Sequence, residues 1–448
     1  MPVTPAMEWW RAGSPAAAGR PVLRERSLSL PAPQARARLP FVALMIFTCL
    51  LMLAPQSFVP ALAPLHPAML AAGVAMMALL YEKLSHRESV IGIAPEIWIA
   101  LGLGGWAALT LPLSLWPAGS LGYLIDPFGK TLALLWLFAG VVVTQARLRA
   151  MAWCLVLTTA PLALTGVWNL LSGVFVPGGN APGFARIAGY EAPLTANPND
   201  LALTLNLILP LGVALLLIVR RPMLRAVLFA IVALDVVAVI ATFSRGGFLT
   251  LMTIFLAYLV RLSGRSPLIL FLPFLLLLCV PLLPSGYVDH METITHINSD
   301  PTGSAQERWD DLAAAARVVQ TNPLTGAGVG MNALAMNAER GATWRMVHNV
   351  YLQYAVELGL PGLLLFLILL ARCIRKAGAA RSSAARVERG GPLFHLAEAL
   401  QIGLIAFAVA ALFHPVGYQF YFYLLAGLTL GLEAAVAAAD PHEGATLV

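Results

Sequence analysis

Charged residues are scarce in this chain of 448 residues: Asp, Glu, Lys and Arg make up 11%, whereas hydrophobic residues make up 59%. This balance excludes a water-soluble domain of ordinary composition. Cysteine is scarce too, and the four present show neither paired nor metal-type spacing (Cys49, Cys154, Cys279 and Cys373). A disulfide framework is therefore not indicated. The sequence also has no repeat of fixed period, no Asp-x-Asp motif and no cluster of His and Asp at ligand spacing, so we expect no metal site.

Apolar segments recur along nearly all of the chain, at lengths near the ~20 residues that cross a bilayer as a helix. Twelve spans are predicted, at about 40–55, 64–81, 95–115, 127–145, 150–174, 199–219, 222–242, 246–262, 266–284, 347–371, 393–413 and 418–437. The sequence therefore predicts an all-α, polytopic membrane protein. Its net charge of +6 reflects arginines that face anionic lipid, and no pattern indicates nucleic-acid binding.

The distribution of basic residues predicts how the spans are oriented. The first forty residues carry six arginines and no apolar run typical of a cleaved signal peptide, so the N-terminus is expected in the cytoplasm. With alternating spans, the cytoplasmic segments then hold 21 of the 28 Lys and Arg residues, as membrane proteins prefer. Both termini are cytoplasmic in this arrangement. The predicted order is a tail (1–39), nine spans (40–284), a large outer loop (285–346), three spans (347–437) with a flexible, basic cytoplasmic loop (372–391), and a tail (438–448).

Seven basic residues remain on the outer face, where the same preference disfavours positive charge: Lys130, Arg186, Arg245, Arg308, Arg317, Arg340 and Arg345. Arg186 lies in a Gly/Pro-rich loop that leads into the sixth span, and Arg245 lies in the tight turn between spans seven and eight. Their placement favours a functional role. Lipid headgroups or ion pairs within the loops are the alternative partners.

The large outer loop is predicted to contain a helix of its own. Ser304 to Glu307 form a capping box, and apolar residues follow at helical spacing (Trp309, Leu312, Ala313, Ala316 and Val319). We expect this apolar face to lie on the outer ends of the spans. The glycines at 326, 328 and 330 suit a backbone that approaches a ligand or another chain closely, or else a plain flexible loop.

His348 lies where the outer loop re-enters the bilayer. Helical spacing from His348 gives Ala355, Gly359 and Gly362, a stripe of small residues that lets membrane helices pack closely. His348 is therefore predicted to point into the outer mouth of the bundle. A purely structural histidine is the alternative.

Four motifs follow one another on the predicted outer face: "RIAGYEAPLTANPNDLA" (186–202), "SRGG" (244–247), "ERW" with "NPLTGAGVGMN" (307–332), and "HNVYLQYAVELGLPG" (348–362). Together they resemble the O-antigen ligase/polymerase superfamily of membrane glycosyltransferases. The resemblance implies a GT-C-like fold and glycosyl transfer at the periplasmic face of a Gram-negative inner membrane. The implied donor is a glycan on undecaprenyl diphosphate, and the implied acceptor of a ligase is the outer-core sugar of lipid A-core. A polymerase would use a second lipid-linked repeat and a protein O-oligosaccharyltransferase a protein hydroxyl. The modest length and single outer loop are most similar to the ligases.

The resemblance also implies roles for residues. Arg186 and Arg245 are expected to bind the diphosphate, because a guanidinium stays charged and offers a planar fork to phosphate oxygens. His348 is expected to be the base that takes the proton of the acceptor hydroxyl. The other predicted substrate-binding residues are Arg308, Asn349, Asn199, Tyr190 and Arg345.

No paired carboxylates are evident among the outer acids, so we expect direct attack with inversion at the anomeric carbon and no cofactor. Asp235, inside the seventh span, is expected to support a neighbouring helix or an arginine. The site prediction requires Arg186, Arg245 and His348 to share one pocket at the outer leaflet. A twelve-helix secondary transporter is the alternative class, although transporters bind substrate near the midplane, and here the polar residues gather at one surface.

Overall fold

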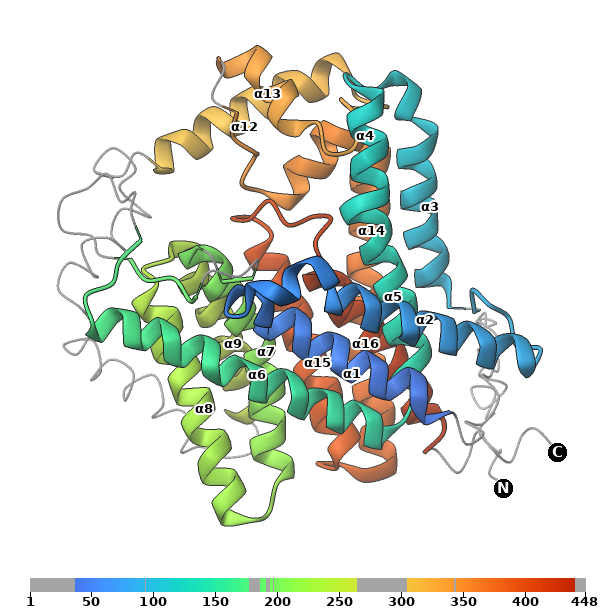
Figure 1. The fold of residues 1–448 in the computed structure, drawn as a ribbon, viewed down its shortest axis with the longest axis vertical. Coiled ribbons are helices and arrows are strands. Elements are labelled where there is room, and N and C mark those ends of the chain that lie inside the picture. Colours follow the sequence, from blue (N-terminus) through green and yellow to red (C-terminus); the bar gives the residue numbers. More distant parts are fainter. Residues whose placement is uncertain are drawn as a thin grey trace, which may run out of the picture. The chain divides into compact units, whose positions relative to one another are not determined.

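The computed structural model describes residues 37–92, 94–176, 186–190, 194–195, 197–263, 304–341 and 344–439, without the side chains of residues 262, 263, 304, 305, 307 and 308. Every secondary-structure element in this part of the chain is a helix (Figure 1). All of them belong to one unit, Ala32–Val448. The all-α prediction is confirmed for the described residues.

Eight helical segments of the described residues are long and apolar enough to cross a membrane: Pro60–Ser85, Pro117–Val141, Gln145–Leu171, Pro198–Ile218, Pro222–Ala241, Val350–Glu388, Pro392–Ala410 and Phe420–Ala437. Each coincides with a predicted span, so the chain is a polytopic membrane protein. Three more predicted spans are helices: α1 (Arg38–Leu53), α3 (Pro95–Leu109) and α9 (Arg245–Ser263). The ninth, 266–284, lies outside the described residues. The count of twelve and the placement of the termini stay predictions.

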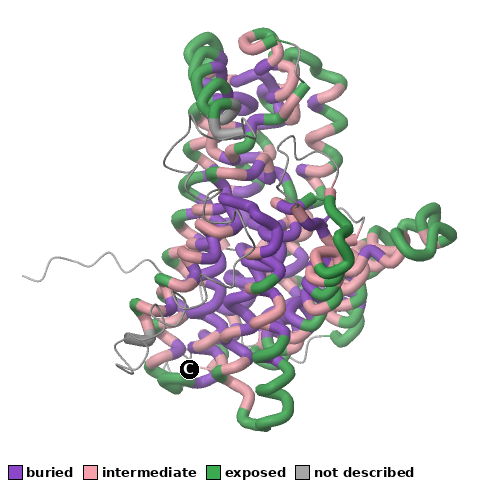
Figure 2. Tube along the Cα trace, turned by 90° about the vertical axis from the view of Figure 1, so that its left-hand side faces the viewer, coloured by how far each residue is buried: buried purple, intermediate pink, exposed green. Residues whose placement is uncertain are grey.

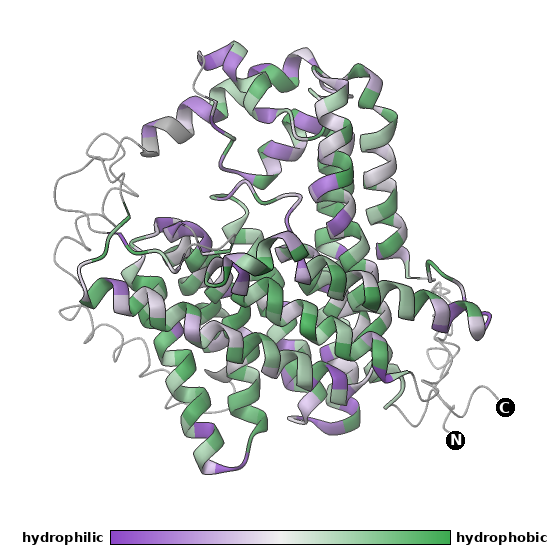
Figure 3. Ribbon diagram, in the orientation of Figure 1, coloured by the Kyte–Doolittle hydropathy of each residue, from purple (hydrophilic) through white to green (hydrophobic). Residues whose placement is uncertain are grey.

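Helices α7 (Pro198–Ile218), α15 (Pro392–Ala410) and α16 (Phe420–Ala437) form the interior of the bundle, with most of their residues buried (Figure 2). α15 packs against α7, α9 and α14, and α16 packs against α5 (Lys130–Val141). In contrast, α2 (Pro67–Ser85) and α8 (Pro222–Ala241), which are largely hydrophobic (Figure 3), have few buried residues. Apolar helices with this exposure suit hydrocarbon rather than water.

Two predicted boundaries differ from the structure. The third span ends at Leu109 rather than near 115, and the fourth begins at Pro117 rather than 127. Between α4 (Pro117–Tyr123) and α5, the segment Leu124–Gly129 leaves helical geometry at Asp126. A polar residue followed by proline interrupts the backbone here, so one apolar run forms two helices.

Outer-loop helix α12 (Ser304–Thr321) exists, but the prediction of its buried face was wrong. Ala314, Ala315 and Val318 are buried, whereas Trp309 and Leu312 are exposed. The buried side packs against α13 (Asn332–Arg340) and the start of α14. Alanines at four consecutive positions make every side of α12 partly apolar, so hydrophobic spacing cannot select one. The side chains of the predicted capping box lie outside the described residues.

The prediction of a flexible loop at 372–391 was wrong, because α14 (Val350–Glu388) continues through most of it. α14 is kinked at Gly359, which has φ of +68°. The part after the kink, residues 360–388, is about 44 Å long at 1.5 Å per residue, which exceeds the roughly 30 Å of the hydrocarbon core. Glycine adopts this backbone conformation without the steric cost of a Cβ atom.

Ion pairs explain why the basic run is helical. Arg372 lies 2.9 Å and Lys376 3.1 Å from the carboxylate of Glu96, a buried residue of α3. Arg381 lies 3.5 Å from the buried carboxylate of Glu398 in α15. These bases were expected to face lipid, but they form ion pairs with acids that lie far away in the sequence.

Candidate active site

The ends of several helices meet at the segment 186–190. Asn169, near the end of α6 (Gln145–Leu171), donates a hydrogen bond of 2.9 Å to the carbonyl of Ala188. Tyr190 donates one of 2.6 Å to the carbonyl of Leu53, at the end of α1. Burial raises the pKa of the Tyr190 phenol to about 12. Its hydroxyl therefore stays protonated and anchors this segment to α1.

Arg186 and the turn that carries Arg245 are brought together by Asn199, in the first turn of α7. The side-chain oxygen of Asn199 accepts hydrogen bonds of 2.8 Å from both Arg186 Nη2 and Ser244 Oγ. Arg186 Nε also donates to the carbonyl of Thr242, at 3.2 Å. Because two acceptors bind one guanidinium, its plane is fixed. The two motifs that carry Arg186 and Arg245 thus meet at the side-chain amide of Asn199.

The electrostatic field at this cluster favours an anion. Arg245 is the first residue of α9, and only 7% of its surface is exposed. α7 also begins here, with Asn197 as its N-cap, accepting from the backbone N–H groups of Asn199 and Asp200. Each helix N-terminus carries roughly half a positive charge. The oriented guanidinium of Arg186 and two helix N-termini therefore act in the same direction, and the carboxylate of Asp200 in the first turn of α7 opposes them.

The turn between α15 and α16 borders this cluster. Buried His414 places Nε2 3.2 Å from the carbonyl oxygen of Asn199 and Nδ1 2.9 Å from that of Ala410. Ala411, in the same turn, accepts a hydrogen bond of 2.7 Å from the N–H of Val350, the first residue of α14. The turn therefore connects the arginine cluster to the segment of His348.

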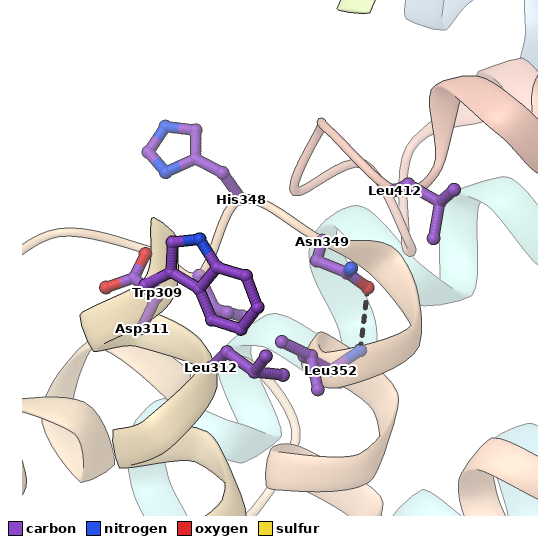
Figure 4. Close-up of a pocket in the computed structure, with 8 residues that line it drawn as sticks. Trp309, Asp311, Leu312, His348, Asn349, Leu352 and Leu412 are labelled. Carbon is purple, nitrogen blue, oxygen red and sulfur yellow. Dashed lines mark hydrogen bonds between the residues drawn. The ribbon is translucent and has the colours of Figure 1, made fainter. Parts of the chain in front are cut away.

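His348 is exposed and lines a cavity of about 180 Å³ with residues of α12, α14 and the α15–α16 turn: Trp309, Asp311, Leu312, Val347, Asn349, Leu352 and Leu412 (Figure 4). The imidazole projects from the extended segment that precedes α14. Asn349 is the N-cap of that helix, and its side-chain oxygen accepts from the N–H of Leu352 at 3.0 Å. A helix cap thus fixes the backbone directly after His348.

A buried carboxylate fixes the glycine-rich loop that precedes α13. Glu357 is fully buried in α14, and its oxygens accept from the N–H of Gly330 at 2.7 Å and from both the backbone and the side-chain amide of Asn332. Gly328 and Gly330 have φ of +103° and +77°, and a Cβ atom on Gly328 would lie 2.1 Å from Ser114 Oγ. The alternative of a plain flexible loop is therefore wrong.

The same contacts reach His348 from its N-terminal side. The side-chain oxygen of buried Asn332 accepts a hydrogen bond of 3.0 Å from the N–H of Val347. Val347 directly precedes His348 and is itself buried. We refer to Glu357, Asn332 and Val347 as the carboxylate relay. With the cap at Asn349, it holds the backbone on both sides of the histidine.

The sequence pattern of the family described as O-antigen ligase matches residues 227–367. The matched segment contains Arg245, Arg308 and His348, together with the whole carboxylate relay. Over residues 227–367 the chain is therefore similar to the O-antigen ligase family. No curated protein matches the chain.

The structure gathers some predicted site residues and separates others. Arg186, Asn199 and the turn of Arg245 form one cluster, whereas the described lining of the cavity at His348 contains neither arginine. The arginine cluster and the described cavity are neighbouring sites beside the turn after α15, and one pocket shared by Arg186, Arg245 and His348 stays a prediction. Arg345 is half-buried, and its carbonyl oxygen accepts from Arg340. The side chain of Arg308 lies outside the described residues.

Asp235 is buried and accepts a hydrogen bond of 2.9 Å from Thr159 of α6, a contact with a neighbouring helix of the kind expected. Sequence reasoning did not find two residues that connect the site. Ser244 stands inside the "SRGG" motif, where the arginine drew attention. Asn332 ends the glycine motif, and nothing in the sequence signals its bond to Val347.

Proposed function

We propose that this chain is an O-antigen ligase, which transfers a polysaccharide from undecaprenyl diphosphate to the outer-core sugar of lipid A-core. The reaction takes place at the periplasmic face of the inner membrane. The observation that carries the proposal is the arrangement of two sites at one end of the helices. A cationic cluster around Asn199 and an exposed histidine lie on either side of the α15–α16 turn, and the family match includes Arg245 and His348.

In this proposal the arginine cluster binds the diphosphate of the donor. Diphosphate is a good leaving group when its charge is neutralised, so bound cations replace a strong general acid. Arg186 is oriented by Asn199 and Thr242, and its guanidinium binds phosphate oxygens. Preorganised donors of this kind typically contribute about 10²–10³ in rate each.

His348 is the base in this proposal. The acceptor hydroxyl attacks the anomeric carbon of the donor sugar, and its proton moves to a ring nitrogen of His348. The bond between the anomeric carbon and the phosphate oxygen breaks, and undecaprenyl diphosphate leaves with the electron pair. One direct displacement inverts the anomeric configuration, and the arginines supply the positive charge without a metal ion. General base catalysis contributes roughly 10²–10⁴.

A polymerase and a protein O-oligosaccharyltransferase are alternatives in the same superfamily, since they differ in the acceptor rather than in the bond that breaks. A reconstituted assay separates them. Purified protein in liposomes receives one lipid-linked glycan donor, with lipid A-core and a second lipid-linked glycan in competition and excess chelator present. We expect transfer to lipid A-core. Extension of the lipid-linked glycan instead indicates a polymerase, and a strict metal requirement contradicts the role given to the arginines.

A further inference from the structure

The outward side of α12 carries large apolar side chains that its own helix neighbours do not cover. Trp309 is 53% exposed and Leu312 41% exposed, whereas Ala314, Ala315 and Val318 on the other side pack against α13 and α14. Exposed apolar groups that border a cavity indicate a binding surface more often than isolated ones do.

This side of α12 faces the cavity at His348 (Figure 4). Three elements far apart in the sequence meet there: Trp309 comes from α12, Leu352 from α14, and Leu412 from the α15–α16 turn. The polar groups of the cavity are the imidazole of His348, the amide of Asn349 and a carboxylate. Apolar and aromatic walls with a few oriented polar groups are typical of sites for small organic ligands.

The acidic side chain in the described lining of the cavity, Asp311, is buried and forms an ion pair with Arg340 of α13, so its charge is compensated. The cationic cluster around Asn199 lies on the other side of the α15–α16 turn. The imidazole of His348 and the amide of Asn349 can form hydrogen bonds with hydroxyl groups. With the apolar walls, these groups suit a ligand rich in hydroxyls.

We propose that Trp309 is a binding platform for a sugar ring of the acceptor glycan. A pyranose has a face of C–H groups that an indole can cover, and a rim of hydroxyls that polar side chains can bind. The ring on Trp309 presents a hydroxyl toward His348. The acceptor side is assigned because a base must touch the attacking hydroxyl, while the donor diphosphate is held at the arginines. This inference rests on the proposed function for the identity of the glycan.

Trp309→Ala and Trp309→Phe test the platform, with Trp344→Ala as the matched control. Trp344 lies in the same extramembrane region and is 68% exposed, but it does not line the cavity. The probe is core oligosaccharide released by mild acid from the lipopolysaccharide of the bacterium that encodes the chain. Its binding to the full-length protein in nanodiscs is measured by saturation-transfer NMR, and steady-state kinetics is measured with lipid A-core.

We expect Trp309→Ala to raise KM for lipid A-core by roughly tenfold to thirtyfold, the loss expected for one aromatic anchor. The KM for the donor should not change, Trp309→Phe should retain most of the affinity, and Trp344→Ala should match the parent protein. Equal acceptor KM in Trp309→Ala and the parent overturns the platform, as does oligosaccharide binding that Trp309→Ala leaves intact. Displacement of the probe by lipid alone shows a lipid site and also overturns it. If the oligosaccharide binds through Trp309 but no transfer occurs, the platform stands and the proposed reaction fails.

Discussion

At the scale of single residues, Arg186 shows that a positive charge alone does not provide hydrogen-bond donors in a fixed orientation. Two of its guanidinium nitrogens donate to Asn199 and Thr242, a geometry that a lysine ammonium cannot reproduce. We expect Arg186→Lys to lower the transfer rate by about 10²-fold with normal folding. Arg221→Lys is the control, since Arg221 is an exposed arginine at the other end of α7. Transfer in liposomes measures both. Equal rates for Arg186→Lys and the parent would remove Arg186 from diphosphate binding.

A substitution of His348 tests the second proposed role, that of the base. It is exposed on the surface of the cavity, so its replacement by alanine leaves no gap in the core. We expect His348→Ala to lower the rate by roughly 10²–10⁴-fold and to leave cells with truncated lipopolysaccharide. Electrophoresis of lipopolysaccharide from complemented cells measures this. The exposed His66 provides the control variant His66→Ala, and full-length lipopolysaccharide with His348→Ala would exclude the base.

At the scale of elements, the carboxylate relay links α14 to the segment of His348. In Asn332→Ala, Glu357 loses its side-chain donor and the N–H of Val347 loses its acceptor. We expect kcat to fall about tenfold with little change in KM, because the base is displaced rather than lost. Asn337→Ala is the matched control. Asn337 lies on the same helix and accepts from the N–H of Trp344, four residues before the histidine.

Two roles of the relay must be separated, namely positioning of the histidine and stabilisation of the fold. A missing partner for a buried carboxylate costs about 1–3 kcal/mol in the free energy of unfolding, so stability alone does not separate the two roles. The pH dependence of kcat does, since a displaced base changes the profile and a merely less stable protein does not. An unchanged profile with proportional loss of folded protein would make the relay purely structural.

The opposite end of α14 gives a prediction about stability. Glu96 is buried, and it pairs with Arg372 and Lys376. Both partners keep some access to solvent, and Lys376 also pairs with Glu433 at 2.6 Å, so Glu96→Gln should cost about 1–3 kcal/mol. The thermal midpoint in detergent should fall, whereas Glu388→Gln at the exposed end of the helix should leave it unchanged. Equal midpoints would mean that the pairs do not stabilise α14.

These elements also show how far sequence reasoning reaches. Apolar runs predict helices in lipid because every backbone group must be bonded within its segment, and the eight candidate spans follow this rule. The orientation of α12 could not be predicted, since its alanines leave the choice to the ion pair of Asp311 with Arg340. The helical continuation after Arg372 depends on acids in α3 and α15, which no local pattern reveals.

At the scale of the whole molecule, the sequence motifs predicted which residues lie close together. They did not predict that these residues lie at two places, the arginine cluster and the cavity at His348. Asn199 and Arg186 share one motif, and their bond follows from closeness in the sequence. The α15–α16 turn contributes Leu412 to one site and His414 to the other, and it lies outside every motif. The division into two sites therefore arises from the packing of α15 beside α7 and α14, which is a property of the folded chain.

A transferase and a transporter differ in which membrane face reaches these two sites. In a background with the native cysteines replaced, we expect Arg186→Cys and His348→Cys to react with an impermeant maleimide from the periplasmic side alone. Ser382→Cys, exposed near the other end of α14, should react only from the cytoplasmic side. In the His348→Cys variant, which keeps the arginine cluster, added donor should not expose position 348 inward, because transfer requires binding but not passage. Donor-dependent labelling of position 348 from both sides would instead show alternating access, and labelling of positions 348 and 382 from one side would contradict the membrane orientation.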